Sequence, residues 1–213
     1  MRPALGREDF FVSGSNQTAV AALNDWSRWP LAKLILLGET GSGKTHLTHV
    51  WANETEARIV PANRLGDYDL TEVSQGAVAI EDLHLISPTD ETLLFHLHNM
   101  LAQSGTPLLL TSALSPTEQK FTLPDLGSRM QGTSVVMLDA PDDALLGAVI
   151  LKRFSDLQLN VAPNVVPYLL KNIERSFDAA HRIVDLLDRA ALRENRAVTR
   201  SLAARILSEN SID

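Results

Sequence analysis

The sequence predicts an α/β protein in which a five-stranded parallel sheet flanked by helices is followed by an all-helical domain. Short apolar runs alternate with helix-like segments up to about residue 140, and this alternation is typical of a parallel sheet. After Pro141 the strand-like runs stop and helical patterns take over. We therefore expect a base domain over residues 1–140 and a helical lid domain over residues 141–213.

The base domain contains five apolar runs that are short enough to be strands. They are residues 34–37, 58–61, 77–80, 107–112 and 135–138. A helix is expected before the first run, with Ser15 or Asn16 as its cap. After the third run we expect Asp90 to cap an amphipathic helix that ends at Gly105. Residues 123–130 are expected to form a turn or a short helix.

The lid domain is predicted to contain four helices. They cover approximately residues 142–156, 163–173, 176–194 and 199–209. Asp139 or Thr199 would suit as helix caps. Pro141 and Pro163 would suit the first turn of a helix, because a backbone N–H is not needed there.

The composition excludes several classes of protein. With 213 residues, 45% of them hydrophobic, the chain can bury a core of useful size. It has no cysteine, which excludes disulfides and thiolate metal sites and suits a reducing cytoplasm, where we expect the protein. A net charge of −7 argues against tight nucleic-acid binding by the chain itself, because such proteins present a basic face. No apolar run approaches membrane-spanning length, so no membrane partner is expected.

A glycine-rich segment after the first apolar run has the pattern of a phosphate-binding loop. Gly38, Gly43, Lys44 and Thr45 fit G-x-x-x-x-G-K-[ST] between an expected strand and an expected helix. Glycines let consecutive N–H groups point into one concavity, and the following helix adds the partial positive charge of its N-terminus. Lys44 is expected on the β- and γ-phosphates and the Thr45 hydroxyl on Mg²⁺. A glycine-rich turn with a solvated lysine is the alternative, and the strand–loop–helix context disfavours it. The expected nucleotide-binding set also includes Glu39, Thr40, Gly41, Ser42 and His46.

Two adjacent carboxylates close the third apolar run. Glu81 and Asp82 are expected at the C-terminal end of a buried strand beside the phosphate loop, where they can hold Mg²⁺ and polarise water. In an ATPase, Asp82 would orient the water, and Glu81 or Thr45 would hold the metal. The alternative is a pair of capping acids at a strand end. The fourth apolar run also ends in polar residues, Thr111 and Ser112.

Phe10 and Phe11 precede the first expected helix and allow two interpretations. They could staple this helix to the core, or they could wall a purine pocket, because a nucleotide base needs a flat apolar cover. From spacing alone we expect the staple.

The histidines do not predict a metal site. His46 and His49 are three residues apart, but no third ligand stands at a suitable spacing. His96 and His98 are expected on different faces of their helix. We expect these side chains to be packed or solvated.

Together these motifs resemble the DnaA-related family of AAA+ ATPases. Residues 11–16 are similar to the family's adenine-side motif, which places Phe11 and Val12 near the base. Residues 38–49 resemble its Walker A segment, and residues 80–84 its Walker B segment. The resemblance covers nearly the whole chain and implies a site for ADP or ATP with Mg²⁺. It also makes Thr111 and Ser112 part of a sensor I strand.

Residues 123–129 and 186–190 are similar to the Hda group of this family, regulators that inactivate DnaA after initiation. The resemblance implies a negative regulator of replication initiation with DnaA as its partner. Arg129 would be an arginine finger that acts in trans on the γ-phosphate of a neighbouring site. A homo-oligomer is compatible with the resemblance, whereas strong direct DNA binding is not expected, since nothing resembles DnaA's basic helix-turn-helix domain.

Three features differ from the family pattern. Glu81 stands where Walker B usually opens with Asp. The sensor II arginine falls on Asp178, and Arg182, one helical turn later, is the candidate to replace it. Residues 1–9 contain no Gln/Leu-rich peptide of the kind that grips the sliding clamp, so we expect either a truncated N-terminus or another way of docking on the clamp.

Three functions follow from these observations. The first is a regulator that holds ADP or ATP between base and lid and presents Arg129 to DnaA. The second is an autonomous AAA+ ATPase, and Asp178 in place of an arginine disfavours it. The third is a DNA-binding fragment of an initiator, which the missing basic domain disfavours.

Overall fold

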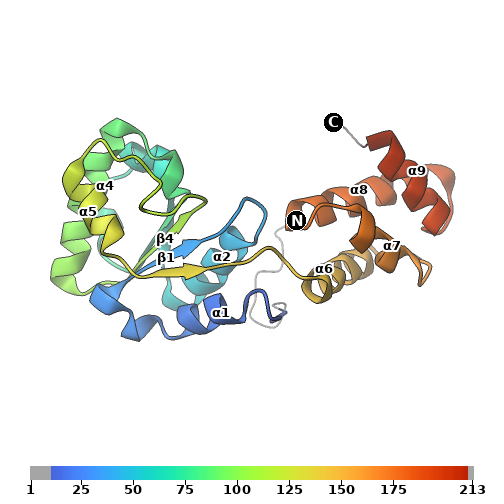
Figure 1. Ribbon diagram of the computed structural model, residues 1–213, viewed down its shortest axis with the longest axis horizontal. Coiled ribbons are helices and arrows are strands. Elements are labelled where there is room, and N and C mark those ends of the chain that lie inside the picture. The colour runs from blue at the N-terminus through green and yellow to red at the C-terminus, as the bar shows by residue number, and fades with distance from the viewer. Residues whose placement is uncertain (1–10, 211–213) are drawn as a thin grey trace. The chain divides into compact units, whose positions relative to one another are not determined.

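The computed structural model of the protein describes residues 11–210. These residues form two compact units, which divide between Asp139 and Ala140. The first unit contains a sheet and the second consists of helices (Figure 1).

The sheet of the first unit has five parallel strands in the order β2-β3-β4-β1-β5. This confirms the predicted parallel five-stranded sheet. Because the strands are parallel, their carboxyl ends meet at one edge, and β4 brings the ends of β1 and β3 to either side of its own. The strands are β1 (Lys33–Leu37), β2 (Arg58–Pro61), β3 (Val78–Glu81), β4 (Leu108–Ser112) and β5 (Val135–Met137).

Helices cover both faces of the sheet, because successive side chains of each strand point to opposite faces. On β1, Leu34 and Leu36 pack with α1 (Gln17–Asn24) and α2 (Lys44–Thr55). Ile35 packs on the other face, in the cluster that holds the apolar sides of α4 and α5. Figure 1 shows the two pairs of helices on opposite sides of the strands. The bounds of the second pair are α4 (Pro88–Ser104) and α5 (Pro124–Gln131).

Short helical segments complete the first unit. They are η2 (Trp26–Arg28), η3 (Pro30–Ala32), η4 (Ala62–Asp67), α3 (Leu70–Val73) and η5 (Leu83–Leu85).

Two helix caps of the first unit differ from the prediction. Ser87, not Asp90, caps α4: the Ser87 hydroxyl accepts a hydrogen bond from the Asp90 N–H at 3.2 Å, so Asp90 lies within the first turn. Asn16 stands at the N-cap position of α1 but makes no capping bond, because its Oδ1 accepts from the Ser13 N–H at 2.9 Å instead. The predicted C-terminus of α4 at Gly105 is confirmed.

The second unit consists of four helices around an aliphatic core. Leu146, Phe154, Leu169, Val184 and Leu202 are among the buried residues of this core. The helices are α6 (Asp143–Asp156), α7 (Val165–Asn172), α8 (Phe177–Glu194) and α9 (Arg200–Asn210).

The starts of two helices in the second unit correct the prediction. Asp142, not Asp139, caps α6, with its Oδ1 accepting from the Leu145 N–H at 2.8 Å. Pro141 and Pro163 both stand before the cap residues of α6 and α7 and are outside the helices. The sequence offers several acids here, and only the path of the backbone decides which of their carboxylates meets a free N–H group.

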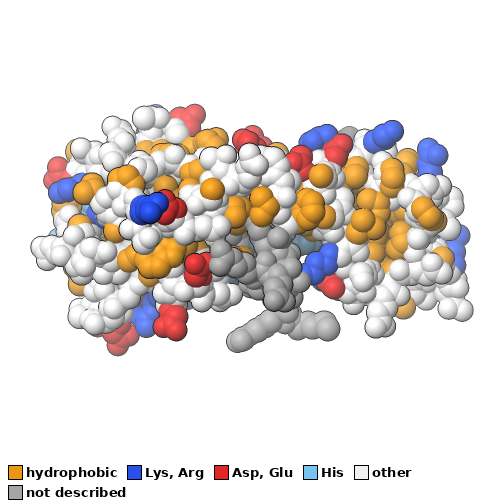
Figure 2. All heavy atoms as spheres, turned by 90° about the horizontal axis from the view of Figure 1, so that it is seen from below, with side chains coloured by type: hydrophobic (Ala, Val, Ile, Leu, Met, Phe, Trp, Pro, Cys, Tyr) orange, Lys and Arg blue, Asp and Glu red, His pale blue; other side chains and the backbone are white. Residues whose placement is uncertain are grey.

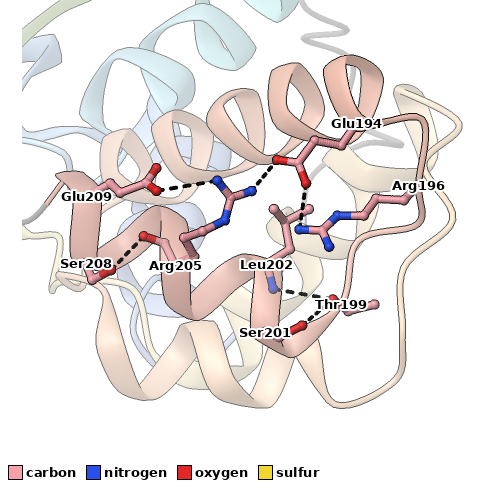
Figure 3. Close-up of polar contacts among 8 residues, drawn as sticks. All are labelled: Glu194, Arg196, Thr199, Ser201, Leu202, Arg205, Ser208 and Glu209. Carbon is pink, nitrogen blue, oxygen red and sulfur yellow. Dashed lines mark hydrogen bonds and ion pairs between the residues drawn. The ribbon is translucent and has the colours of Figure 1, made fainter.

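At α9 the prediction is confirmed. The Thr199 hydroxyl accepts from the Leu202 N–H at 3.3 Å (Figure 3). Arg205 of α9 pairs with Glu194 of α8 and with Glu209, and Arg196 also reaches Glu194, as Figure 3 shows. These side chains are solvent-exposed, so the ion pairs add little to the stability that the core provides.

No helix of the described part of the chain is both long enough and apolar enough to cross a membrane.

Candidate functional site

The loop between β1 and α2 is folded around the ammonium group of Lys44. Its Nζ donates to the carbonyl oxygens of Gly38 at 2.7 Å and Glu39 at 2.8 Å, and the residue is 7% exposed. Two positions require glycine: Gly43 has φ 100°, and a Cβ on Gly38 would lie 2.6 Å from the Leu138 carbonyl oxygen. The loop therefore curls as its sequence pattern predicts, and α2 begins directly at Lys44 with its free N–H groups toward the loop.

Glu81 lies beside the first turn of α2. It is the last residue of β3, and its carboxylate is hydrogen-bonded to the Thr45 hydroxyl. Burial raises the pKa of Glu81, and the bond from Thr45 and the nearby His49 and Lys44 oppose this rise. Its Oε1 is buried and has no hydrogen-bond partner among residues 11–210. A carboxylate oxygen without a partner next to a hydroxyl is a donor set that suits a hard cation such as Mg²⁺.

Asp82 follows β3 in a left-handed backbone conformation, with φ 55°. Its N–H donates to the Thr111 hydroxyl at 3.0 Å, and Thr111 is 1% exposed at the end of β4. Aspartate tolerates this conformation better than most residues, and the neighbouring strand holds it there. Burial lowers the pKa of Lys44, while Asp82 and Glu81 raise it, so the two acids and the lysine share one electrostatic environment.

The Ser112 side chain forms hydrogen bonds within the turn after β4, and its role as a sensor residue stays a prediction. Its hydroxyl donates to the Leu114 carbonyl oxygen at 2.6 Å and so closes the turn after β4. Its own carbonyl oxygen accepts from the Gly38 N–H at 3.1 Å and holds the start of the β1–α2 loop. Thr111 is therefore brought to the acids, whereas the side chain of Ser112 is occupied in a turn.

Phe11 and Val12 stand before α1. Phe11 is 47% exposed and is absent from the buried clusters, so the predicted staple is wrong for Phe11, and Phe10 lies outside the described residues. Val12 is also half exposed and lines a small hollow together with Leu47 and Trp51. Both side chains are therefore exposed, and their role beside a nucleotide base stays a prediction.

Arg129 lies on α5 near the start of β1, whereas the loop that contains Lys44 follows the end of β1. It is exposed, and it lies close enough to Lys33, the first residue of β1, to lower the pKa of that lysine. Four residue steps of a strand separate Lys33 from Leu37, which is about 13 Å at 3.3 Å per residue. Within the described residues the Arg129 side chain has no ion pair or hydrogen bond. The arginine and the β1–α2 loop thus lie at opposite ends of β1.

Comparison with known proteins identifies the fold and the relatives. No protein-family model matches the chain. An uncharacterised protein of Haemophilus influenzae is 30% identical over 184 residues, which are 80% of this chain and 79% of that protein. The chain belongs to the family of this protein.

Solved structures with the same fold include several AAA+ ATPases. Domain III of the Thermotoga maritima replication initiation protein DnaA superimposes with a TM-score of 0.79 at 21% identity, over 98% of both chains. DnaA from Aquifex aeolicus bound to AMPPCP gives 0.70 at 20% identity, over 91% of this chain and 70% of that one. The Thermotoga maritima RuvB branch migration motor gives 0.72 at 15% identity, over 98% and 72%. The chain has the AAA+ fold.

Two features of the structure were not predicted from the sequence. Lys33 of β1 and His98 of α4 are each 3% exposed and are hydrogen-bonded to each other. In the sequence, the sign of this buried pair is Lys33, a charged residue at the start of an otherwise apolar strand. The second feature is Glu91 of α4, a carboxylate that is only 3% exposed.

Arg182 lies exposed on α8 of the second unit, one turn after Asp178, and its role toward a nucleotide stays a prediction.

Proposed function

We propose that the chain is an adenine-nucleotide-binding AAA+ protein of the Hda type, which stimulates ATP hydrolysis on DnaA through Arg129. The observation that carries this proposal is the separation of Arg129 from the chain's own phosphate loop. The loop groups gather at the carboxyl edge of the sheet, and Arg129 lies near the start of β1. An arginine in this place reaches a neighbour's nucleotide more easily than its own.

Binding of ADP or ATP would use the loop around Lys44. The ammonium group would exchange the carbonyl oxygens of Gly38 and Glu39 for phosphate oxygens, and the N-terminus of α2 would add its dipole. Thr45 and Glu81 would hold Mg²⁺, which neutralises charge on the β- and γ-phosphates. That a DnaA with this fold binds AMPPCP supports an adenine nucleotide.

Arg129 would act on the γ-phosphate of a nucleotide in a neighbouring molecule. A guanidinium group stabilises the charge that spreads over the phosphoryl oxygens in the transition state. The arginine is exposed and, within residues 11–210, unpaired, so it needs no rearrangement of an existing ion pair to reach out. DnaA is the proposed neighbour, and a second copy of this chain is the alternative partner of the same chemistry.

An autonomous ATPase is the second candidate, and one observation favours it. Thr45, Glu81, Asp82 and Thr111 of one chain are linked at the edge of its own sheet. In this case Asp82 would orient the attacking water.

A DNA-binding role gains no such support. On the face drawn in Figure 2, the Lys and Arg side chains of the described residues are scattered and form no continuous patch.

ATP turnover by purified DnaA, with and without this chain and DNA-loaded sliding clamp, tests the proposal. We expect little turnover by the chain alone and a clear stimulation of DnaA. Arg129→Ala should abolish the stimulation and leave ADP affinity unchanged, and Arg28→Ala, which removes an exposed arginine of the same unit, is the matched control. Equal stimulation by wild type and Arg129→Ala would exclude the arginine finger. Rapid turnover by the chain alone would favour the second candidate.

A further inference from the structure

The connection that leads into α5 is fastened by a buried carboxylate of α4. Glu91 is 3% exposed, and no lysine or arginine is paired with it among the described residues. Instead it accepts three hydrogen bonds. Oε1 accepts from the Thr122 N–H at 3.0 Å, and Oε2 accepts from the Thr122 hydroxyl at 2.8 Å and the Leu123 N–H at 2.6 Å. Such bonds to a charged acceptor are about twice as strong as neutral ones, and they compensate the burial of the charge.

These bonds fix the place where α5 begins. Leu123 is the N-cap residue of α5, and its apolar side chain cannot cap the helix. Glu91 supplies an acceptor at this end from another helix. On the inner side, Leu126 and Met130 of α5 are fully buried in the same cluster as Leu94 and Leu97 of α4. The direction of α5 is therefore set by an apolar contact along one face and by the Glu91 carboxylate at its start.

The same connection is held at a second point. The Gln119 side-chain amide donates to the Leu83 carbonyl oxygen at 2.9 Å, and Leu83 directly follows Asp82. The segment between β4 and α5 is thus attached both to α4 and to the turn after the third strand. Arg129, five residues after the start of α5, has no hydrogen bond or ion pair of its own side chain within residues 11–210. Its position therefore depends on these attachments of the segment that precedes α5.

We propose that Glu91 is a positioning residue for Arg129. It acts through the start of α5 and touches neither nucleotide nor partner. This inference rests on the proposed function, since it concerns how the arginine is aimed at a neighbouring phosphate. A displacement of about 1 Å at a transition-state contact reduces a rate by up to about 100-fold, so loss of the attachment has a measurable effect.

The test is the stimulation of ATP hydrolysis on DnaA by Glu91→Gln, measured over a range of concentrations up to saturation. The Thr122 and Leu123 N–H groups bond different oxygens of Glu91, and glutamine replaces one of these oxygens by an NH₂ group, so one N–H group would face a donor instead of an acceptor. We expect a roughly tenfold lower plateau with the half-saturating concentration unchanged. A smaller folded fraction would shift the half-saturating concentration and leave the plateau, so the two effects are distinguishable. Glu72→Gln, on an exposed helix of the same unit, is the control.

Two further measurements keep the inference separate from folding and from the proposed function. Thr122→Val removes only the hydroxyl bond and should lower the plateau by a smaller factor. Amide hydrogen exchange at Leu123 should be faster in Glu91→Gln than in wild type, while the affinity for ADP stays the same. If Glu91→Gln reaches the same plateau as the wild type, the positioning role is wrong, whereas the proposed function still stands. If the wild type gives no stimulation, the proposed function fails and the positioning role falls with it.

Discussion

Lys33 and His98 form a hydrogen-bonded pair in the interior of the first unit, with Nζ 2.8 Å from Nε2 and each residue 3% exposed. Burial and the nearby Arg129 lower the pKa of Lys33 from 10.5 to about 8. Burial, and then Lys33, lower the pKa of His98 from 6.5 to about 4. The imidazole is therefore neutral at pH 7 and accepts a hydrogen bond from the ammonium group. No carboxylate of the described residues is paired with this lysine.

The pair predicts two pH windows in stability. Between pH 8 and 10.5 the unfolded chain keeps the Lys33 proton that the folded chain has released, so the free energy of unfolding rises with pH. Between pH 4 and 6.5 the unfolded chain binds a proton on His98 that the folded chain does not, so stability falls as the pH is lowered. Both contributions come from groups whose charged form is disfavoured by burial.

Replacing both residues by apolar ones of similar size should remove these contributions. We expect Lys33→Met/His98→Leu to raise the free energy of unfolding at pH 7 by about 1–4 kcal/mol, because a buried charge is removed without leaving a partner unpaired. Urea unfolding at a series of pH values measures the difference between variant and wild type. Lys171→Met, on the exposed side of α7, is the control. A difference that does not change with pH would contradict the assignment of the two windows to this pair.

Lys44→Ala should weaken ADP binding by about 2–3 kcal/mol, because a charge-assisted contact with phosphate is lost. Isothermal titration calorimetry gives this value directly. The Lys44 ammonium also binds two loop carbonyl oxygens, so the thermal stability of the nucleotide-free variant is measured alongside. Lys171→Ala serves as the matched control. Equal ADP affinity in the variant and wild type would show that the loop does not bind phosphate.

Gly38→Ala should destabilise the protein and disturb the loop. Its Cβ would lie 2.6 Å from the backbone oxygen of Leu138, which no side-chain rotation can relieve. We expect a loss of about 1–3 kcal/mol in the free energy of unfolding, the usual cost of overpacking. Gly76→Ala is the control, since a Cβ there meets no atom within 4 Å. Similar losses at the two positions would argue against a close approach at Gly38.

Arg129→Lys should fail to restore stimulation of DnaA. A lysine keeps the positive charge but not the planar fork that contacts two phosphoryl oxygens at once. The expected result is a rate near that of Arg129→Ala in the same turnover assay, with ADP affinity of the chain itself unchanged. Full stimulation by the lysine variant would mean that a point charge is sufficient and would remove the argument for a bidentate finger.

The sequence alone was enough to predict the parallel sheet and the curled, glycine-rich loop between β1 and α2. Both depend on local patterns: runs of consecutive apolar residues for strands buried on two faces, and glycines where only glycine fits, as at Gly43 with φ 100°. The order of the motifs along the chain also placed Glu81 at the end of its strand. These features need no knowledge of which distant segments meet.

Only the tertiary structure showed which residues, distant in the sequence, form hydrogen bonds with one another around these elements. Thr111 holds the backbone of Asp82 across a separation of 29 residues, and Glu91 reaches Thr122 across 31. His98 meets Lys33 across 65. A hydrogen bond between distant residues leaves no periodicity in a single sequence, because its partners are brought together by the strand order and by the packing of α4 and α5. For the same reason the choice of Asp142 rather than Asp139 as a cap followed from the path of the backbone and not from residue type.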